Sequence, residues 1–423
     1  MGAHHDHGHG SMRLRAGSPE VARALRVAIG LLLVATVVGL VVLRPTGSTP
    51  KAPGVTPGTI FVTGSVLEVD PVNCPSQYDE TTDCLTARVR VTSGPTYGDI
   101  ATLPVTLGIP GAVDLHRGDD IRMAYFAKAP KDLRYTFDDF QRGTPMLLLA
   151  VVFAIAVVLL SRLQGLRALL GMAVSLAVIV GFLLPALLRG GPPLPLALVA
   201  AIVVAFAALY LAHGIHVGTH VAFAGSVLSL GLTTALGAGF ISLCHFTGFS
   251  DETAATLTVA AGKLDVRGLI LAGLVIGALG VLDDITVTQV SAVAELQRAD
   301  PTASALDLYR SGLRIGRDHV ASTVNTLVLA YAGASLPLLL LFSQGGRSIG
   351  GVLTTETVAV EIVRAIVGSI GLVAAVPITT GLAAWVVHRP PGMGDDGGPD
   401  GSEQGDPENA WAADDEADFW ARR

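Results

Sequence analysis

Eight long apolar stretches constrain the fold of this chain more than any other feature. Each reaches the length, roughly 17–25 residues, that a helix needs to cross the hydrocarbon core of a bilayer. Backbone polar groups in that core must be satisfied within the segment, so such stretches form helices. We therefore predict an all-α polytopic membrane protein with about eight transmembrane helices. The stretches are residues 24–43, 145–161, 166–188, 194–212, 221–243, 267–295, 319–342 and 358–387.

The composition agrees with this class and argues against others. Only 15% of the residues are charged, against roughly 25% in soluble domains. No stretch combines basic and aromatic residues in the way that nucleic-acid binding requires. We find no constellation for catalysis, for a cofactor or for a resident metal, and expect a protein that is not an enzyme and whose first partner is the lipid bilayer.

Lysine and arginine in short flanks predict the orientation. With eight helices, four basic groups fall on one side, which we expect to be the cytoplasm of a plasma-membrane protein with both termini inside. A signal peptide is the alternative for the first stretch, but no A-x-A-like cleavage site follows it, which favours an uncleaved anchor. The groups are Arg13, Arg15, Arg23 and Arg26; Arg162 and Arg167; Arg298, Arg310, Arg314 and Arg317; and His388 and Arg389.

The segments between and beyond the apolar stretches divide the chain into five parts. Residues 1–23 form a leader before the first helix at 24–43, and residues 44–144 form an extracytoplasmic domain. A membrane domain of seven helices covers residues 145–387. The tail 388–423 is rich in acid, glycine and proline, a composition typical of disorder.

The extracytoplasmic part has short β-type runs separated by turn residues, which predict a small β-rich domain, with an OB-like barrel as one candidate. We interpret it as a structural or partner-docking domain. Cys74 and Cys84 could close a disulfide there; two free thiols are the alternative. The predicted strands are residues 60–69, 85–91, 100–107 and 121–126.

The sixth stretch contains two neighbouring acids, Asp283 and Asp284. They follow Arg267 by about 25 Å of helix, which places them near or just past the bilayer midplane. A carboxylate at that depth is costly and usually functional. Two ionised neighbours in a low dielectric repel each other, so at least one is expected to hold a proton near neutral pH. The pair is therefore a candidate proton or cation carrier.

The spacing around Asp284 sharpens this hypothesis. At 100° per residue, Thr288 and Ser291 lie on the same face of the helix as Asp284. Three glycines lie on this face on the extracytoplasmic side of Asp284. Along the helix, this face therefore changes from glycines to polar residues. Asn325 in the next stretch could continue a polar route. The alternative is that these groups only join helices by hydrogen bonds or mark a kink. Adjacent acids on one helix point about 100° apart, which argues against an aspartyl-protease pair.

A candidate entrance lies in the outer loop before this helix, where His245, Asp251 and Glu252 could attract a cation. A solvated loop is the alternative. After the helix, residues 300–319 alternate apolar residues with arginines and resemble an interfacial amphipathic helix.

Two motifs carry a resemblance to a known family. GALGVLDDITVTQVSAVAEL (277–296) and IGRDHVASTVNTLVLAYAGASLPLLLLF (315–342) resemble the hallmark regions of the YibE/F-like family of multipass membrane proteins. The resemblance implies membrane class and location. Residues 267–342 are also weakly similar to the core of RND-type and sterol-sensing-type transporters, in which equivalent aspartates relay protons.

These observations support two hypotheses of function. The first is a proton- or cation-coupled secondary transporter of an unknown small substrate, with Asp283 and Asp284 as carrier site. Because only one transporter-like half is present, it would work as a homo-oligomer or with a partner membrane subunit. The second is a non-transporting scaffold or envelope-assembly partner that acts through its extracytoplasmic domain.

Overall fold

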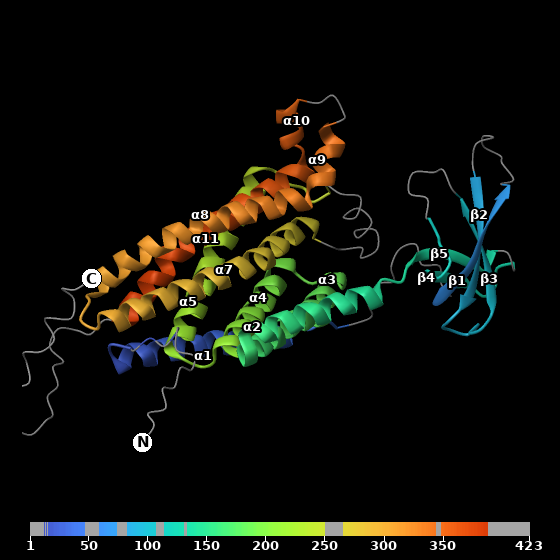
Figure 1. The fold of residues 1–423 in the computed structure, drawn as a ribbon. Coiled ribbons are helices and arrows are strands. Elements are labelled where there is room, and N and C mark those ends of the chain that lie inside the picture. The colour runs from blue at the N-terminus through green and yellow to red at the C-terminus, as the bar shows by residue number, and fades with distance from the viewer. Residues whose placement is uncertain are drawn as a thin grey trace, which may run out of the picture.

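The computed structural model contains a helical domain and a small sheet (Figure 1). It describes residues 12, 14, 16–46, 59–73, 83–106, 114–130, 133–249, 265–343 and 348–387. Six of the described helices are long and apolar enough to cross a membrane. They are α1 (Pro19–Val42), α2 with its continuation (Gly143–Leu188), α4 (Pro193–His213), α5 (Val217–Leu243), α7 (Val266–Ala299) and α11 (Glu356–Val387).

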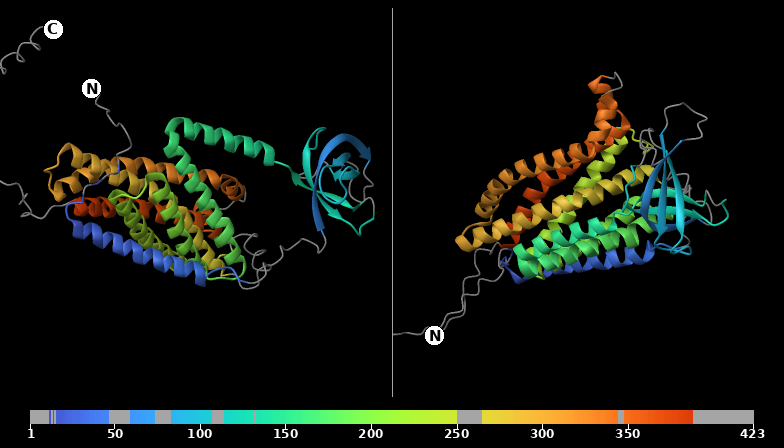
Figure 2. Two further views of the ribbon diagram at one scale, coloured as in Figure 1. Left: turned by 90° about the horizontal axis from the view of Figure 1, so that it is seen from below. Right: turned by 45° about the vertical axis from the view of Figure 1, so that its right-hand side comes forward.

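The second and third predicted stretches form two helical arms that meet at a sharp kink. α2 (Gly143–Val178) continues through a π-helical turn (Ile179–Leu183) into α3 (Leu184–Leu188). At Arg162 the backbone leaves helical geometry, with φ 50° and ψ −128°, a conformation that is strained for a residue with a Cβ. Two arms meet there at a sharp kink (Figure 2). The apolar pattern therefore predicts both arms and the break between them.

The seventh predicted stretch differs more from the structure. The amphipathic segment and this stretch form one helix, α8 (Ala305–Ala334), followed by the short helices α9 (Leu336–Ser343) and α10 (Ile349–Leu353). Ser304 caps α8, with its hydroxyl accepting a hydrogen bond from the Asp307 amide. α8 is not among the six apolar helices, and only part of its second half is apolar.

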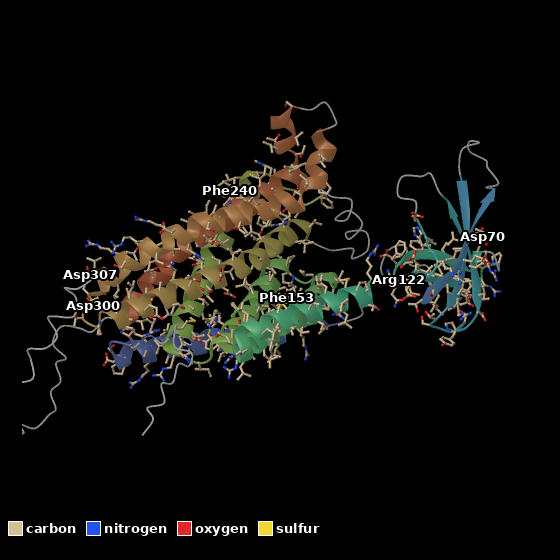
Figure 3. The ribbon with its side chains drawn as sticks, in the orientation of Figure 1. Asp70, Arg122, Phe153, Phe240, Asp300 and Asp307 are labelled. Carbon is tan, nitrogen blue, oxygen red and sulfur yellow. The ribbon has the colours of Figure 1, made fainter. Side chains whose placement is uncertain are left out.

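The helical core is built around α5, α7 and α11, which pack on one another along most of their lengths, with α4 and α8 on the flanks. Small residues permit this close approach. α11 ends at the same end of the bundle at which α1 begins, because the amide of Gly17 donates a hydrogen bond to the carbonyl of Val386. Asp300 and Asp307 lie at this end, and the sheet lies beyond the opposite end (Figure 3).

The sheet has five antiparallel strands in the order β3-β2-β1-β4-β5. The sequence predicts the first four strands to within a few residues, and β5 is the addition. Alternate residues of β1 and β4, such as Val62, Val66, Ile121 and Met123, are fully buried in its core. The strands are β1 (Thr59–Asn73), β2 (Asp83–Val91), β3 (Ile100–Thr106), β4 (Asp120–Phe126) and β5 (Tyr135–Phe140).

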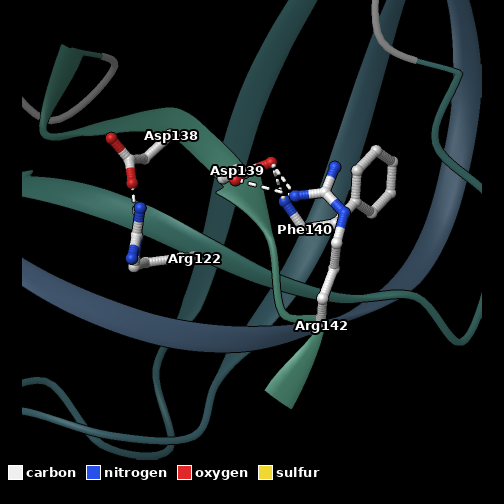
Figure 4. Close-up of polar contacts among 5 residues, drawn as sticks. All are labelled: Arg122, Asp138, Asp139, Phe140 and Arg142. Atoms are coloured by element: carbon white, nitrogen blue, oxygen red, sulfur yellow. Dashed lines mark hydrogen bonds and ion pairs between the residues drawn. The ribbon is translucent and has the colours of Figure 1, made fainter. Parts of the chain in front are cut away.

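Charged contacts join the last strand to the start of the membrane domain (Figure 4). Asp139 accepts hydrogen bonds from Arg142 Nη1 at 2.8 Å and from the Phe140 amide at 2.8 Å. The Arg142 hydrogen bond, followed by that of Phe140, lowers the pKa of Asp139 from its ordinary value of 3.8. On the neighbouring strand, Arg122 pairs with Asp138.

We expect Asp139→Asn to lower the unfolding temperature of the sheet in the full-length protein at neutral pH. A carboxyl group with a depressed pKa stabilises the folded state above its unfolded pKa, and this contribution disappears as pH falls through the folded value. The difference from the parent should therefore be present at pH 7, begin to shrink near pH 3.8 and vanish only below the lowered pKa of the folded state. Calorimetry across this range checks it, with Asp99→Asn as control because the Asp99 side chain makes no hydrogen bond among the described residues. A difference that persists at low pH would contradict the prediction.

Candidate functional site

The two acids of α7 occupy different environments. Asp283 is half-buried against the helical core, and its Oδ1 atom is buried without a hydrogen-bond partner among the described residues. The side chain of Asp284 is 69% exposed, that is, not covered by the rest of the chain. Neighbouring residues on a helix point about 100° apart, so one helix can present one acid inward and the other outward. The sequence identified both acids, but it did not show that one points into the bundle and the other away from it.

Two hydroxyl groups stand beside the buried acid. Ser226 on α5 and Thr286 on α7 are fully buried and share a hydrogen bond of 2.8 Å. Thr286 Oγ1 also donates to the carbonyl oxygen of Asp283 at 3.1 Å, and Ser226 lies close to the Asp283 carboxyl group. A carboxylate, a carbonyl and two hydroxyls thus meet between α5 and α7. Such a set of oxygen atoms can hold a proton or a small hard cation.

Further polar residues follow Asp283 along α7 and on the neighbouring helix α11. Gln289, one turn further along α7, is fully buried, and its Oε1 accepts a hydrogen bond of 2.8 Å from Thr380 on α11. Its Nε2 has no partner among the described residues, and neither has Oγ1 of the buried Thr379. We call the whole set the buried polar seam. Its members are Thr219, Ser226, Ser229, Thr233 and Thr234 of α5, Asp283, Thr286 and Gln289 of α7, and Thr379 and Thr380 of α11.

Sequence analysis missed most of this seam. Each hydroxyl or amide stands alone in an apolar helix, and isolated serines and threonines are common in membrane helices, where they bond to their own backbone. Thr233, for example, donates to the carbonyl of Ser229. Only the packing of three helices shows that these residues share one interface. The usable signal was the high number of such residues in the stretch 219–234.

The predicted stripe through Asp284 forms an outer face of α7. Gly273, Gly277 and Gly280 are exposed along with Asp284, and Thr288 and Ser291 are half-buried. Thr288 bonds to the carbonyl oxygen of Asp284 at 2.9 Å. His319 of α8 brings its Nε2 to 3.8 Å from Asp284 Oδ2, which is longer than a hydrogen bond. The stripe is therefore one face, as its spacing predicted, but it borders α8 rather than the core.

The other predicted site residues that the structure describes do not lie beside Asp283 and Asp284. Asn325 is exposed on α8, and no hydrogen bond links it to Thr288 or Ser291 in the described part of the chain. His245 is exposed just after α5, with a positive φ of 54°. Its predicted companions Asp251 and Glu252 lie outside the described residues, as does Cys74, so both the entrance and the disulfide to Cys84 stay predictions.

A second pair of charged residues, which sequence analysis overlooked, lies in α11. Glu361 accepts a hydrogen bond from Arg364 Nη1 at 2.6 Å, and their side chains are only 29% and 25% exposed. The signal was available, because one acid and one base three residues apart in an apolar stretch suggest an ion pair within one helix. Among the described residues, no group of three or more histidine, cysteine or acidic side chains is placed to hold a metal ion.

Comparison with known proteins finds a family match. No curated protein and no solved structure matches the chain. The similarity to RND-type transporters stays a weak resemblance. The profile of the YibE/F-like proteins matches residues 149–389, a range that contains the helices α4, α5, α7, α8 and α11 and both acids of the candidate site. This match covers more than half of the chain, which therefore belongs to the YibE/F-like family.

Proposed function

We propose that this protein is a proton- or cation-coupled secondary transporter in which Asp283 carries the ion. The observation that carries the proposal is the buried, unpartnered Oδ1 of Asp283 in the middle of a long apolar helix. A buried polar atom without a partner costs free energy, roughly 1–3 kcal/mol. A carboxyl group kept only to hold helices together would bond through both of its oxygens.

The surroundings of Asp283 favour reversible ion binding. Ser226 and Thr286 offer hydroxyls that can donate to a carboxylate and accept from a carboxylic acid. Asp284, on the adjoining exposed face, offers a second acid on a different side of the same helix. Asp283 and Asp284 thus provide two neighbouring ion-binding positions, one inside the bundle and one at its surface. Gln289 and Thr380 extend the polar side chains toward the end where α1 begins.

We further propose that the chain crosses the plasma membrane eight times, with both termini in the cytoplasm. The two arms of α2 and the apolar half of α8 supplement the helices that are apolar over their full length. An even number of crossings agrees with the hydrogen bond between Gly17 and Val386. The sheet would be extracytoplasmic and OB-like, since its strand order places β3 and β5 at the edges and these two strands lie close to each other.

We expect Asp283→Asn to reduce ion flux in proteoliposomes to the level of empty liposomes, because the amide cannot gain or lose a proton or neutralise a cation. Flux is measured with a pH dye under an imposed gradient and, in parallel, as uptake of radioactive sodium. Glu295→Gln is the control, since Glu295 lies on the same helix but pairs with Arg298 at its exposed end. Asp284→Asn should slow the flux without abolishing it.

Two results would contradict the proposal. One is equal flux in the parent and in a well-folded Asp283→Asn variant. The other is a folded parent that moves neither protons nor sodium. Either result would favour the scaffold hypothesis, in which deletion of residues 60–127 removes function and leaves the helices intact.

A further inference from the structure

The Glu361–Arg364 pair lies in the half of the helical domain nearer the start of α11. Counted from Glu356, the two residues are about 8 and about 12 Å along the helix. Glu356 itself marks this end, because its carboxylate accepts hydrogen bonds from the amides of Thr247 and Gly248. The pair therefore sits well away from Asp283, and the buried polar seam does not use it.

The guanidinium group of Arg364 is only partly engaged. Its Nη1 bonds to Glu361, while its Nε is buried without a partner in the described structure. Its Nη2 lies 3.6 Å from the position that a Cβ on Gly273 would occupy. Nε and Nη2 form one edge of the guanidinium, the geometry that binds a carboxylate or a phosphate through two parallel hydrogen bonds.

A second donor stands one helical turn away on the same face. The hydroxyl of Tyr331, from α8, lies 3.3 Å from the Cβ position of Gly277, and no hydrogen bond from it is found among the described residues. Gly273 and Gly277 are about 6 Å apart, as residues four apart on a helix are. Three helices thus bring a guanidinium edge and a hydroxyl over a glycine surface that has no side chains of its own.

We propose that Arg364 and Tyr331 form a binding site for an anionic group with carboxylate or phosphate oxygens, seated over Gly273 and Gly277. Glu361 holds the guanidinium in place through Nη1 and leaves the opposite edge for the ligand. The anion restores hydrogen bonds that a partly buried arginine otherwise lacks. As the site of a transport substrate, an organic acid moved together with the ion of Asp283, it rests on the proposed function.

Binding is tested on the purified full-length protein through its thermal unfolding temperature in detergent. Benzoate and inorganic phosphate are the probes, with chloride at equal ionic strength as reference. We expect at least one probe to raise the unfolding temperature of the parent. The shift should disappear in Arg364→Gln, weaken in Tyr331→Phe and persist in the control Arg310→Gln, an exposed arginine of α8. Glu361→Gln should strengthen the effect, because it removes the competing negative charge.

The double variant Glu361→Gln/Arg364→Gln keeps the test decisive if Arg364→Gln alone fails to fold, since it leaves no unpaired acid. Nanodiscs of phosphatidylglycerol and phosphatidylcholine identify the source of the anion: an Arg364-dependent shift with phosphatidylglycerol assigns a lipid headgroup. Equal shifts in the parent and in the double variant, or no shift with any probe or lipid, would overturn the proposal. Because the readout is binding, this failure is distinguishable from a loss of ion flux in Asp283→Asn.

Discussion

Replacing Gly371 by alanine is expected to destabilise the helical domain, although alanine is normally the better helix former. A Cβ at this position would clash with Oγ1 of Thr233, so α5 and α11 would have to separate. Overpacking of this kind costs typically 1–3 kcal/mol. The matched control is Gly231→Ala on α5, where a Cβ would meet nothing within 4 Å. There the variant should be stabilised by roughly 0.5–1 kcal/mol.

The opposite signs make this test specific to the contact between α5 and α11. Thermal unfolding of the two variants in detergent, followed by the elution profile on size-exclusion chromatography, gives the comparison. Adding Thr233→Ala to Gly371→Ala removes the clashing hydroxyl and should recover part of the loss, as coupling between touching residues requires. If both glycine variants raise, or both lower, the unfolding temperature, the close contact between α5 and α11 at Gly371 is wrong.

The second large effect is expected at Gln289, where stability and activity should separate. Gln289→Leu keeps a similar volume and removes a buried amide whose Nε2 has no partner in the described structure. Thr380 retains its hydrogen bond to the carbonyl of Val376 at 2.6 Å. The variant should therefore unfold at the same temperature as the parent or higher. If the buried polar seam conducts the ion, flux should fall about tenfold, which corresponds to roughly 1.4 kcal/mol on the barrier.

Proteoliposome flux and detergent unfolding, measured on the same preparation, check both halves of this prediction. Gln297→Leu serves as control, since Gln297 stands near the end of the same helix and away from the seam. A Gln289→Leu variant with lower stability and unchanged flux would show that the amide only joins α7 to α11. That result would limit the ion route to Asp283 and its two hydroxyl neighbours.

The membrane class, the apolar helices and the position of the two acids followed from the sequence, because each depends on local properties of the chain. Length and hydropathy identify a helix that crosses a bilayer, and a spacing of 100° per residue groups Asp284 with Thr288 and the glycines. The amphipathic segment and the seventh stretch were predicted as separate elements, and the structure joins them in one helix, α8. A change from polar to apolar residues does not interrupt a helix when no breaker separates the two halves, and α8 runs through Gly316 without a break.

Only the tertiary structure decided which face of each helix is inside. Which of the two acids faces the core depends on how α7 is rotated against α5. The glycine stripe alone suggests that Asp284, and not Asp283, faces the core. Ser226 and Thr380 join the site, and Arg364 reaches Gly273, through contacts between residues about 60 to 90 positions apart. The sequence by itself thus determined which helices are apolar enough to cross a membrane and which charges they carry. The packing of α5, α7, α8 and α11 determined which polar groups meet, because contacts between helices depend on rotation and approach that no single helix encodes.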